Sequence, residues 1–137
     1  MSKFQVREEF VATFEQALRN AGMQRHTGTE DKPKYWRGQA DNTLDDLFLI
    51  YVVTTPVPLE SADNRLFRIE EYINGEVFTR NGFNDGDYQD LCHNIEVECD
   101  KLGLNCTFQD EGRDNTIDTE SPVYYINFEV DAKMLNK

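Results

Sequence analysis

The chain has 137 residues, the size of one domain, and sixteen aromatic residues can supply its core. It has no run of 18 apolar residues and no basic segment leading into an apolar one, so we expect neither a transmembrane helix nor a signal peptide. The net charge is −12, and residues 1–38 hold seven Lys/Arg against five Asp/Glu, whereas the rest hold seven against twenty-one. The negative electrostatic potential of such a chain disfavours nucleic acid and anionic membranes as partners and favours basic partners.

The first predicted element is a helix over about residues 3–21. Ser2 and Gln5 have the spacing of a capping box, and Gly22 provides a left-handed stop. The residues between them form a one-sided apolar stripe: Phe10, Val11, Phe14, Ala17, Leu18 and Ala21.

Residues 22–46 are rich in turn-forming residues and predict an irregular loop, within which residues 34–37 could form a short strand. Residues 47–54 then predict a strong strand. Its apolar run, residues 48–53, does not alternate with polar residues, so both faces should be covered. We expect this strand to lie centrally in the sheet or under a helix.

Asn74-Gly75 allows two interpretations. The pair is a strong signal for a hairpin turn between residues 69–73 and 76–79. The alternation of apolar residues nevertheless continues through Gly75, which is equally compatible with one long strand.

A second helix is predicted after the capping residues 84–87, with Gly103 as its stop. Its apolar stripe contains Tyr88, Leu91, Cys92, Ile95, Cys99 and Leu102. Two strands follow, over residues 104–109 and 123–130, joined by a flexible acidic linker over 110–121.

The predicted order is α-β-β-α-β-β. Strands that meander between helices without regular βαβ spacing indicate an α+β fold. We therefore expect a single domain over residues 1–137, with a mainly antiparallel sheet of about four or five strands and two helices packed on it.

The sequence offers no argument for an enzyme. Cys92 and His93 are neighbours on a helix and point about 100° apart, so they form a poor nucleophile–base pair. Cys92 and Cys99 lie two helical turns apart, about 10 Å, too far for a disulfide. Asp85-Gly86-Asp87 resembles the start of a calcium loop, but Asp90 stands where that loop needs glycine. We predict no catalytic, cofactor-binding or metal-binding residue.

Five stretches of the chain stand out together: an apolar strand (residues 48–55), an acidic loop element (60–65), a second strand (73–79), the close of the second helix (101–104) and a final strand with an acidic lead-in (118–130). In this order they resemble the small tail-completion, or tail-terminator-like, proteins of tailed bacteriophages.

The resemblance implies a non-enzymatic ring subunit without cofactors, typically in hexamers, that caps the tail tube and meets the head–tail connector. It implies assembly in the bacterial host cytoplasm and then a place in the virion, without membrane attachment or specific nucleic-acid binding. A subunit of this size can close such a ring through a sheet edge and a projecting loop.

Two surfaces are candidates for binding partners. Prolines stiffen the connection after residue 54 and leave apolar side chains available there, so we expect a subunit interface at Pro56, Val57, Pro58, Leu59, Asp63 and Asn64. An acidic surface is expected at Asp87, Asp90, Glu96, Glu98, Asp100, Asp110 and Glu111.

The acidic surface has two possible uses. It could line the lumen of a ring, where DNA would slide rather than bind. Alternatively, the protein could be a DNA mimic or inhibitor that presents these carboxylates as phosphate substitutes to a basic nuclease.

Overall fold

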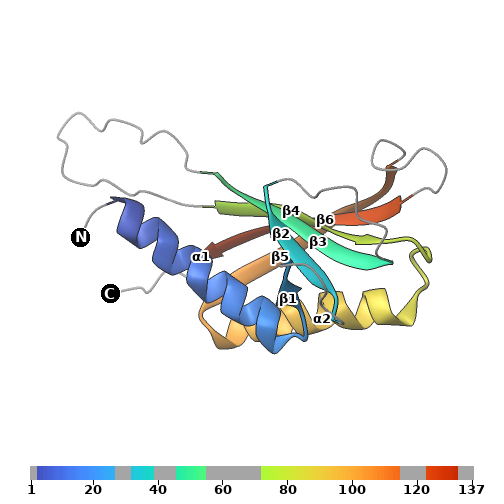
Figure 1. Cartoon of the computed structure of the whole chain (residues 1–137), viewed down its shortest axis with the longest axis horizontal. Helices are drawn as coiled ribbons and strands as arrows, with labels where there is room; N and C mark the ends of the chain where they lie inside the picture. Colours follow the sequence, from blue (N-terminus) through green and yellow to red (C-terminus); the bar gives the residue numbers. More distant parts are fainter. Residues whose placement is uncertain (1–2, 27–31, 39–45, 55–71, 115–122, 133–137) are drawn as a thin grey trace.

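The computed structural model describes residues 3–26, 32–38, 46–54, 72–114 and 123–132. In this part of the chain, two helices lie on one face of a six-stranded sheet (Figure 1). In chain order the elements are α1 (Lys3–Asn20), β1 (Gln24–Arg25), β2 (Lys34–Arg37), β3 (Leu47–Thr54), β4 (Tyr72–Thr79), α2 (Gly86–Lys101), β5 (Leu104–Asp114) and β6 (Val123–Ala132). None of these helices is long and apolar enough to cross a membrane.

The sheet is mixed, so the predicted architecture is wrong. Its strand order is β1-β2-β3-β4-β6-β5. The β1–β2 and β2–β3 pairs are parallel, and the other three pairs are antiparallel. Four strands precede α2, where two were expected, and the total is six rather than four or five.

The error arises in the region predicted as an irregular loop, residues 22–46. It contains β1, whose two residues are too short for any periodic signal, as well as β2. The connections that precede and follow β2 span only residues 26–33 and 38–46. Connections this short usually join antiparallel strands, because a parallel partner requires the chain to return along the strand's length.

The predicted first helix is confirmed. Four residues of its apolar stripe are buried against the sheet: Val11, Phe14, Ala17 and Leu18. Gly22 has a φ of 97°, the left-handed conformation expected of a helix stop.

The strand predicted over residues 47–54 is also confirmed as β3, third in the sheet. Both faces are covered only in its first half, because Phe48 and Leu49 are fully buried but Val52 is 45% exposed. Asn74-Gly75 lies inside β4, so the single long strand is the correct alternative. Gly75 leaves room for Phe128 on β6, since a Cβ at Gly75 would lie 2.5 Å from the Phe128 Cζ.

The second half of the chain follows the predicted pattern with one extension. Asp85 caps α2 by accepting a hydrogen bond from the Asp87 amide. β6 alternates as expected, and β5 begins at Leu104 as expected. However, β5 continues to Asp114, so the first five residues of the predicted linker belong to a strand.

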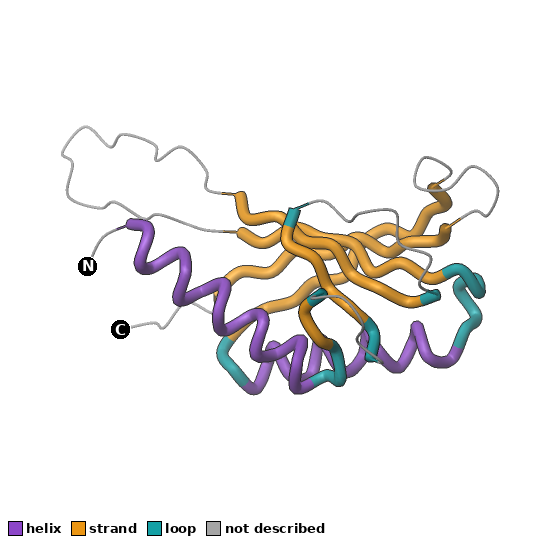
Figure 2. Tube along the Cα trace, viewed as in Figure 1, coloured by secondary structure: helices purple, strands orange, loops and turns teal. Residues whose placement is uncertain are grey.

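The core lies between the helices and the sheet (Figure 2). Side chains from α1 and α2 pack there against alternate residues of β3, β4 and β6. A smaller cluster lies on the opposite face, which neither helix covers: Trp36, Phe48, Phe78 and Val123.

Candidate functional site

The predicted subunit interface at Pro56, Val57, Pro58, Leu59, Asp63 and Asn64 lies outside the described residues. The structure does define where this segment begins and ends. Thr54 pairs with Tyr72 across β3 and β4, and the Asn74 Nδ2 donates to the Thr54 Oγ1 over 3.1 Å. The chain therefore leaves and re-enters the sheet at one end, on two neighbouring strands.

The predicted acidic surface is divided between α2 and β5, which pack against each other. Of the predicted acidic residues, Asp87, Asp90, Glu96 and Asp100 are exposed on α2, and Asp110 and Glu111 are exposed on β5. Burial of the opposite face of α2 explains this placement, because Tyr88, Leu91, Ile95 and Cys99 turn toward the sheet.

Glu98 and Glu111 in this acidic group are bound by other side chains of the fold. The Lys101 Nζ lies 3.1 Å from the Glu98 Oε2, and the Glu98 side chain is only 19% exposed. The Tyr88 hydroxyl donates to the Glu111 Oε2 over 2.9 Å and so ties α2 to β5.

β5 forms one edge of the sheet, and no other strand of the described chain pairs with its outer side. The pairing with β6 is interrupted by a bulge between Phe108 and Glu111. At this bulge the Asp110 amide donates to the Asn127 Oδ1 over 2.9 Å. The free edge is long, but the bulge and the acidic side chains beside it restrict what can pair there.

An open hollow of about 550 Å³ follows this edge between α2 and β5. Its polar lining residues are Glu96, Asp100, Lys101, Asn105, Thr107 and Asp131. A cationic or amide-bearing group fits this lining best. Within the described chain, no group of three or more His, Cys, Asp or Glu residues is arranged to hold a metal ion.

The three cysteines are free thiols with little nucleophilic character. Burial, assisted by the charges of Glu111 and Glu96, raises the pKa of Cys92 to about 12. A hydrogen bond to Cys99 and burial raise the pKa of Cys106 as well. The raised pKa keeps the Cys92 thiol protonated at neutral pH, and His93 is exposed beside the partly buried Cys92, so this pair is a poor nucleophile and base.

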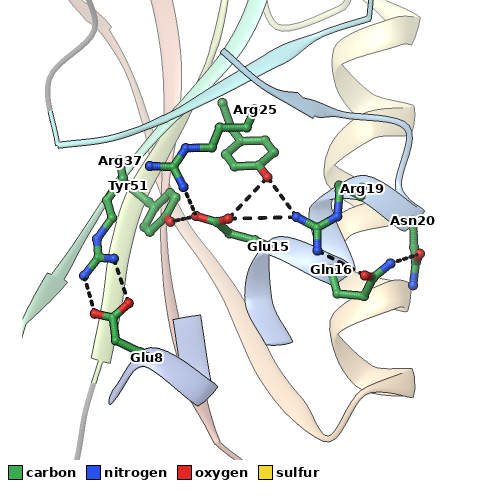
Figure 3. Close-up of polar contacts among 9 residues, drawn as sticks. Glu8, Glu15, Gln16, Arg19, Asn20, Arg25, Arg37 and Tyr51 are labelled. Carbon is green, nitrogen blue, oxygen red and sulfur yellow. Dashed lines mark hydrogen bonds and ion pairs between the residues drawn. The ribbon is translucent and has the colours of Figure 1, made fainter. Parts of the chain in front are cut away.

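The sequence interpretation missed a charged cluster between α1 and the sheet (Figure 3). Glu15 on α1 is only 8% exposed. Its Oε2 accepts a hydrogen bond from the Tyr51 hydroxyl, and its Oε1 accepts one from the Tyr35 hydroxyl over 3.4 Å. Arg25 and Arg19 lie 3.6 Å and 3.9 Å from its carboxylate oxygens.

This cluster has a structural explanation. One carboxylate is held by two hydroxyls and two guanidinium groups, which offsets its desolvation and fixes α1 on β2 and β3. The sequence did indicate that Glu15 would be near the core. It lies four residues after Val11 and three before Leu18, which places it beside the apolar stripe of the helix. Its tyrosine partners are distant in sequence and could not be identified from spacing.

The face of the sheet opposite the two helices carries a row of rings. Their centroids are 4.8 Å apart for His26–Trp36, 5.8 Å for Trp36–Phe48, 4.8 Å for Phe48–Phe78 and 6.4 Å for Phe78–Tyr125. Beside this row lies an open hollow of about 450 Å³ whose lining includes Ile50, Val52, Asn74, Glu76 and Asn127. Burial and the nearby Asp114 raise the pKa of Glu76.

Comparison with protein-family models finds no match, and comparison with curated proteins finds none either.

Proposed function

We propose that the protein is a non-enzymatic structural subunit that assembles with copies of itself into a ring, as a tail-completion or tail-terminator protein at the head–tail junction of a tailed bacteriophage. Its partners are then the tail tube and the head–tail connector. It assembles in the host cytoplasm and remains in the virion. The support for the phage assignment is the sequence resemblance in residues 48–55, 60–65, 73–79, 101–104 and 118–130.

The observation that carries the assembly part is the outer edge of β5. Its backbone groups have no partner strand within the described chain over an element of 11 residues. An edge of this length is a template for pairing with another chain. A subunit that uses this edge toward one neighbour and another surface toward the next makes head-to-tail contacts, which close into a ring when the rotation between subunits allows it.

Native mass spectrometry and electron microscopy of the purified full chain test this proposal. We expect one oligomer of defined subunit number and a ring in projection. We also expect the ring to bind tail tubes, or connectors, made from the genes next to its own. A protein that stays monomeric at high concentration and binds neither structure would overturn the proposal.

The carboxylates of α2 and β5 support a second candidate, an acidic inhibitor that imitates DNA. Asp87, Asp90, Glu96 and Asp100 are exposed along one helix, as phosphate substitutes need to be. The ion pair of Glu98 and the hydrogen bond of Glu111 weaken the case for a DNA mimic, since both carboxylates are bound within the fold. A tight, salt-sensitive complex of a monomer with a basic nuclease would favour this candidate over the ring.

A further inference from the structure

The hollow beside the row of rings lies over the middle of the sheet. Its side chains come from neighbouring strands: Ile50 on β3 pairs with Glu76 on β4, which pairs in turn with Asn127 on β6. Side chains alternate between the two faces of a sheet, and the residues next to Ile50 and Asn127 belong to the core under the helices. The hollow therefore opens on the opposite face. We call it the Glu76 hollow, and its lining also includes Val52, Asn74, Gln109 and Tyr125.

Glu76 is the one charged residue among the described residues that line this hollow. It is partly buried, and its carboxylate makes no hydrogen bond or ion pair within the described chain. Glu15 shows what a carboxylate receives in this protein when its role is structural, namely two hydroxyls and two guanidinium groups. A partly buried carboxylate without such partners costs stability, and a bound cation would offset that cost.

A second hydrogen-bond acceptor lies near this carboxylate. Asn74 is two residues before Glu76 in β4, so both side chains project from the same face, about 7 Å apart along the strand. The Asn74 Nδ2 donates to the Thr54 Oγ1, which leaves the Asn74 Oδ1 as an acceptor. A guanidinium group has five N–H donors in a fixed planar fork, whereas an ammonium group is a compact point charge. The two acceptors therefore suit arginine better than lysine.

The apolar side of the hollow fits the stem of an arginine side chain. Ile50 and Val52 line it from β3, and Val52 is 45% exposed. Arginine packs its methylene groups on apolar surface of this kind while its charged end reaches a polar group. The hollow is open, so it cannot enclose most of the surface of a free small molecule, as small-molecule sites do. It suits a side chain that is carried by a larger surface.

We propose that the Glu76 hollow binds an arginine side chain presented by another protein. The guanidinium group donates to the Glu76 carboxylate and to the Asn74 Oδ1, and the stem lies on Ile50 and Val52. The inference does not rest on the proposed function, because the hollow is not the outer edge of β5. A second copy is a poorer source of the side chain, since these described arginines already interact within their own chain: Arg7, Arg19, Arg25, Arg37 and Arg80.

Nuclear magnetic resonance of the full chain tests the proposal, with N-acetylarginine N-methylamide as the probe and the ionic strength held constant. We expect saturable shifts of the Asn74, Glu76 and Asn127 signals at millimolar probe. The citrulline counterpart has nearly the same shape without the charge, and it should bind roughly tenfold more weakly or worse. The lysine counterpart should also bind more weakly, because it lacks the planar fork of donors.

Glu76→Gln should weaken binding of the arginine probe by roughly tenfold or more, because it removes the charge that strengthens the hydrogen bonds. Glu129→Gln is the matched control. It removes the same charge from the same face, on the residue that pairs with Asn74, but Glu129 does not line the hollow. This control should bind the probe like the wild type. Far-ultraviolet circular dichroism of both variants checks that each is folded.

Equal binding by the wild type and Glu76→Gln, or no binding by either, would overturn the proposal. Equal binding of the arginine probe and either counterpart would overturn the assignment to arginine. Tighter binding of free arginine than of the blocked probe would indicate a site for the free amino acid and would overturn the choice of a protein partner. A smaller oligomer for Glu76→Gln than for the wild type in sedimentation velocity would show that a neighbouring copy supplies the side chain, which would overturn the same choice.

These outcomes are separate from those of the proposed function. A chain that stays monomeric and binds the arginine probe as expected would remove the ring and leave this inference standing. A ring whose subunits do not bind the probe would do the reverse.

Discussion

Glu15 is a carboxylate in the interface between α1 and the sheet, where an ionised group needs several partners. The Tyr51 and Tyr35 hydroxyls and the Arg25 and Arg19 side chains provide them (Figure 3). Burial and the neighbouring Glu15 raise the pKa of both tyrosines, so these hydroxyls remain donors well above neutral pH. The cluster therefore holds α1 in place over the whole physiological pH range.

Tyr51→Phe should lower the free energy of unfolding by about 1–3 kcal/mol, because it removes the hydroxyl and leaves the buried carboxylate short of a donor. Urea denaturation measures this change. Tyr124→Phe is the matched control, since the Tyr124 ring contacts Phe83 and its hydroxyl makes no hydrogen bond to the described part of the chain. Equal losses in the two variants would contradict a special role of the Tyr51 hydroxyl.

Glu76→Gln should stabilise the protein at neutral pH. The folded-state pKa of Glu76 is raised, first by burial and then by Asp114, so the folded protein binds this proton more tightly than the unfolded chain does. The stabilisation from that proton is complete below the unfolded pKa of about 4.3 and is lost as the pH rises through the folded pKa. At neutral pH the ionised carboxylate therefore opposes folding, and glutamine removes this effect.

Urea denaturation at several pH values checks the Glu76 prediction. The gain in unfolding free energy should disappear as the pH falls below the ordinary range of glutamate carboxyls. Glu129→Gln, on the same face of the sheet, is the control and should show a smaller gain. A Glu76→Gln variant that is no more stable than the wild type at neutral pH would contradict the argument.

At the scale of elements, β4 and β6 depend on a close approach at one glycine. Gly75 pairs with Phe128, and a Cβ at Gly75 would lie 2.5 Å from the ring and 2.6 Å from the Ile50 carbonyl oxygen. The ring can move slightly, but the carbonyl belongs to the backbone of the neighbouring strand β3. A side chain at this position therefore requires the strands to separate locally.

Gly75→Ala should lower the free energy of unfolding by about 1–3 kcal/mol, the usual cost of overpacking a core. Gly86→Ala is the control, because a Cβ at this first residue of α2 has nothing within 4 Å. It should be neutral or should stabilise by up to about 1 kcal/mol, since alanine favours a helix. Thermal or urea denaturation of both variants distinguishes the effects, and an equally tolerated Gly75→Ala would refute the close approach.

At the scale of the whole molecule, negative charge is concentrated in the later part of the chain. Residues 1–38 carry a net charge of +2, and residues 39–137 carry −14, which together give −12. Exposed carboxylates on α2 and β5 belong to this excess. In the assembly proposed above, such charges would act on neighbouring subunits before any close contact forms.

Assembly should weaken as the salt concentration rises. The Debye length falls from ~10 Å at 0.1 M to ~3 Å at 1 M salt, so attraction between exposed charges of neighbouring subunits is screened. Sedimentation velocity over this range should show a shift toward the monomer. Assembly that strengthens with salt would instead indicate an apolar contact, for example through the exposed Val52 on the sheet face opposite the helices.

Predictions from the sequence succeeded where the signal was local. The limits of the strand at residues 47–54 agree with β3, because an apolar run bounded by turn-forming residues marks its own ends. The helix stop at Gly22 and the cap at Asp85 were likewise identified from neighbouring residues. The apolar stripe of the second helix was also identified from spacing, since Tyr88, Leu91, Ile95 and Cys99 are buried.

The prediction failed where strands had to be paired. Two residues at β1 carry no periodicity, and the pattern of Lys34–Arg37 does not say whether β2 runs parallel or antiparallel to β3. The residues expected at the subunit interface, Pro56 to Asn64, remain a prediction. The partners of Glu15 are 20 and 36 residues away from it, and helical spacing contains no information about them.

The sequence by itself determined both helices with their buried faces, the strands β3 and β6 and the excess of acidic residues after residue 38, because each depends on residues close together in the chain. Only the tertiary structure decided the mixed sheet, the place of Gly75 within a strand and the surroundings of Glu15. These features depend on which distant segments meet, and that is set by the packing of the whole core, which no single stretch of sequence specifies.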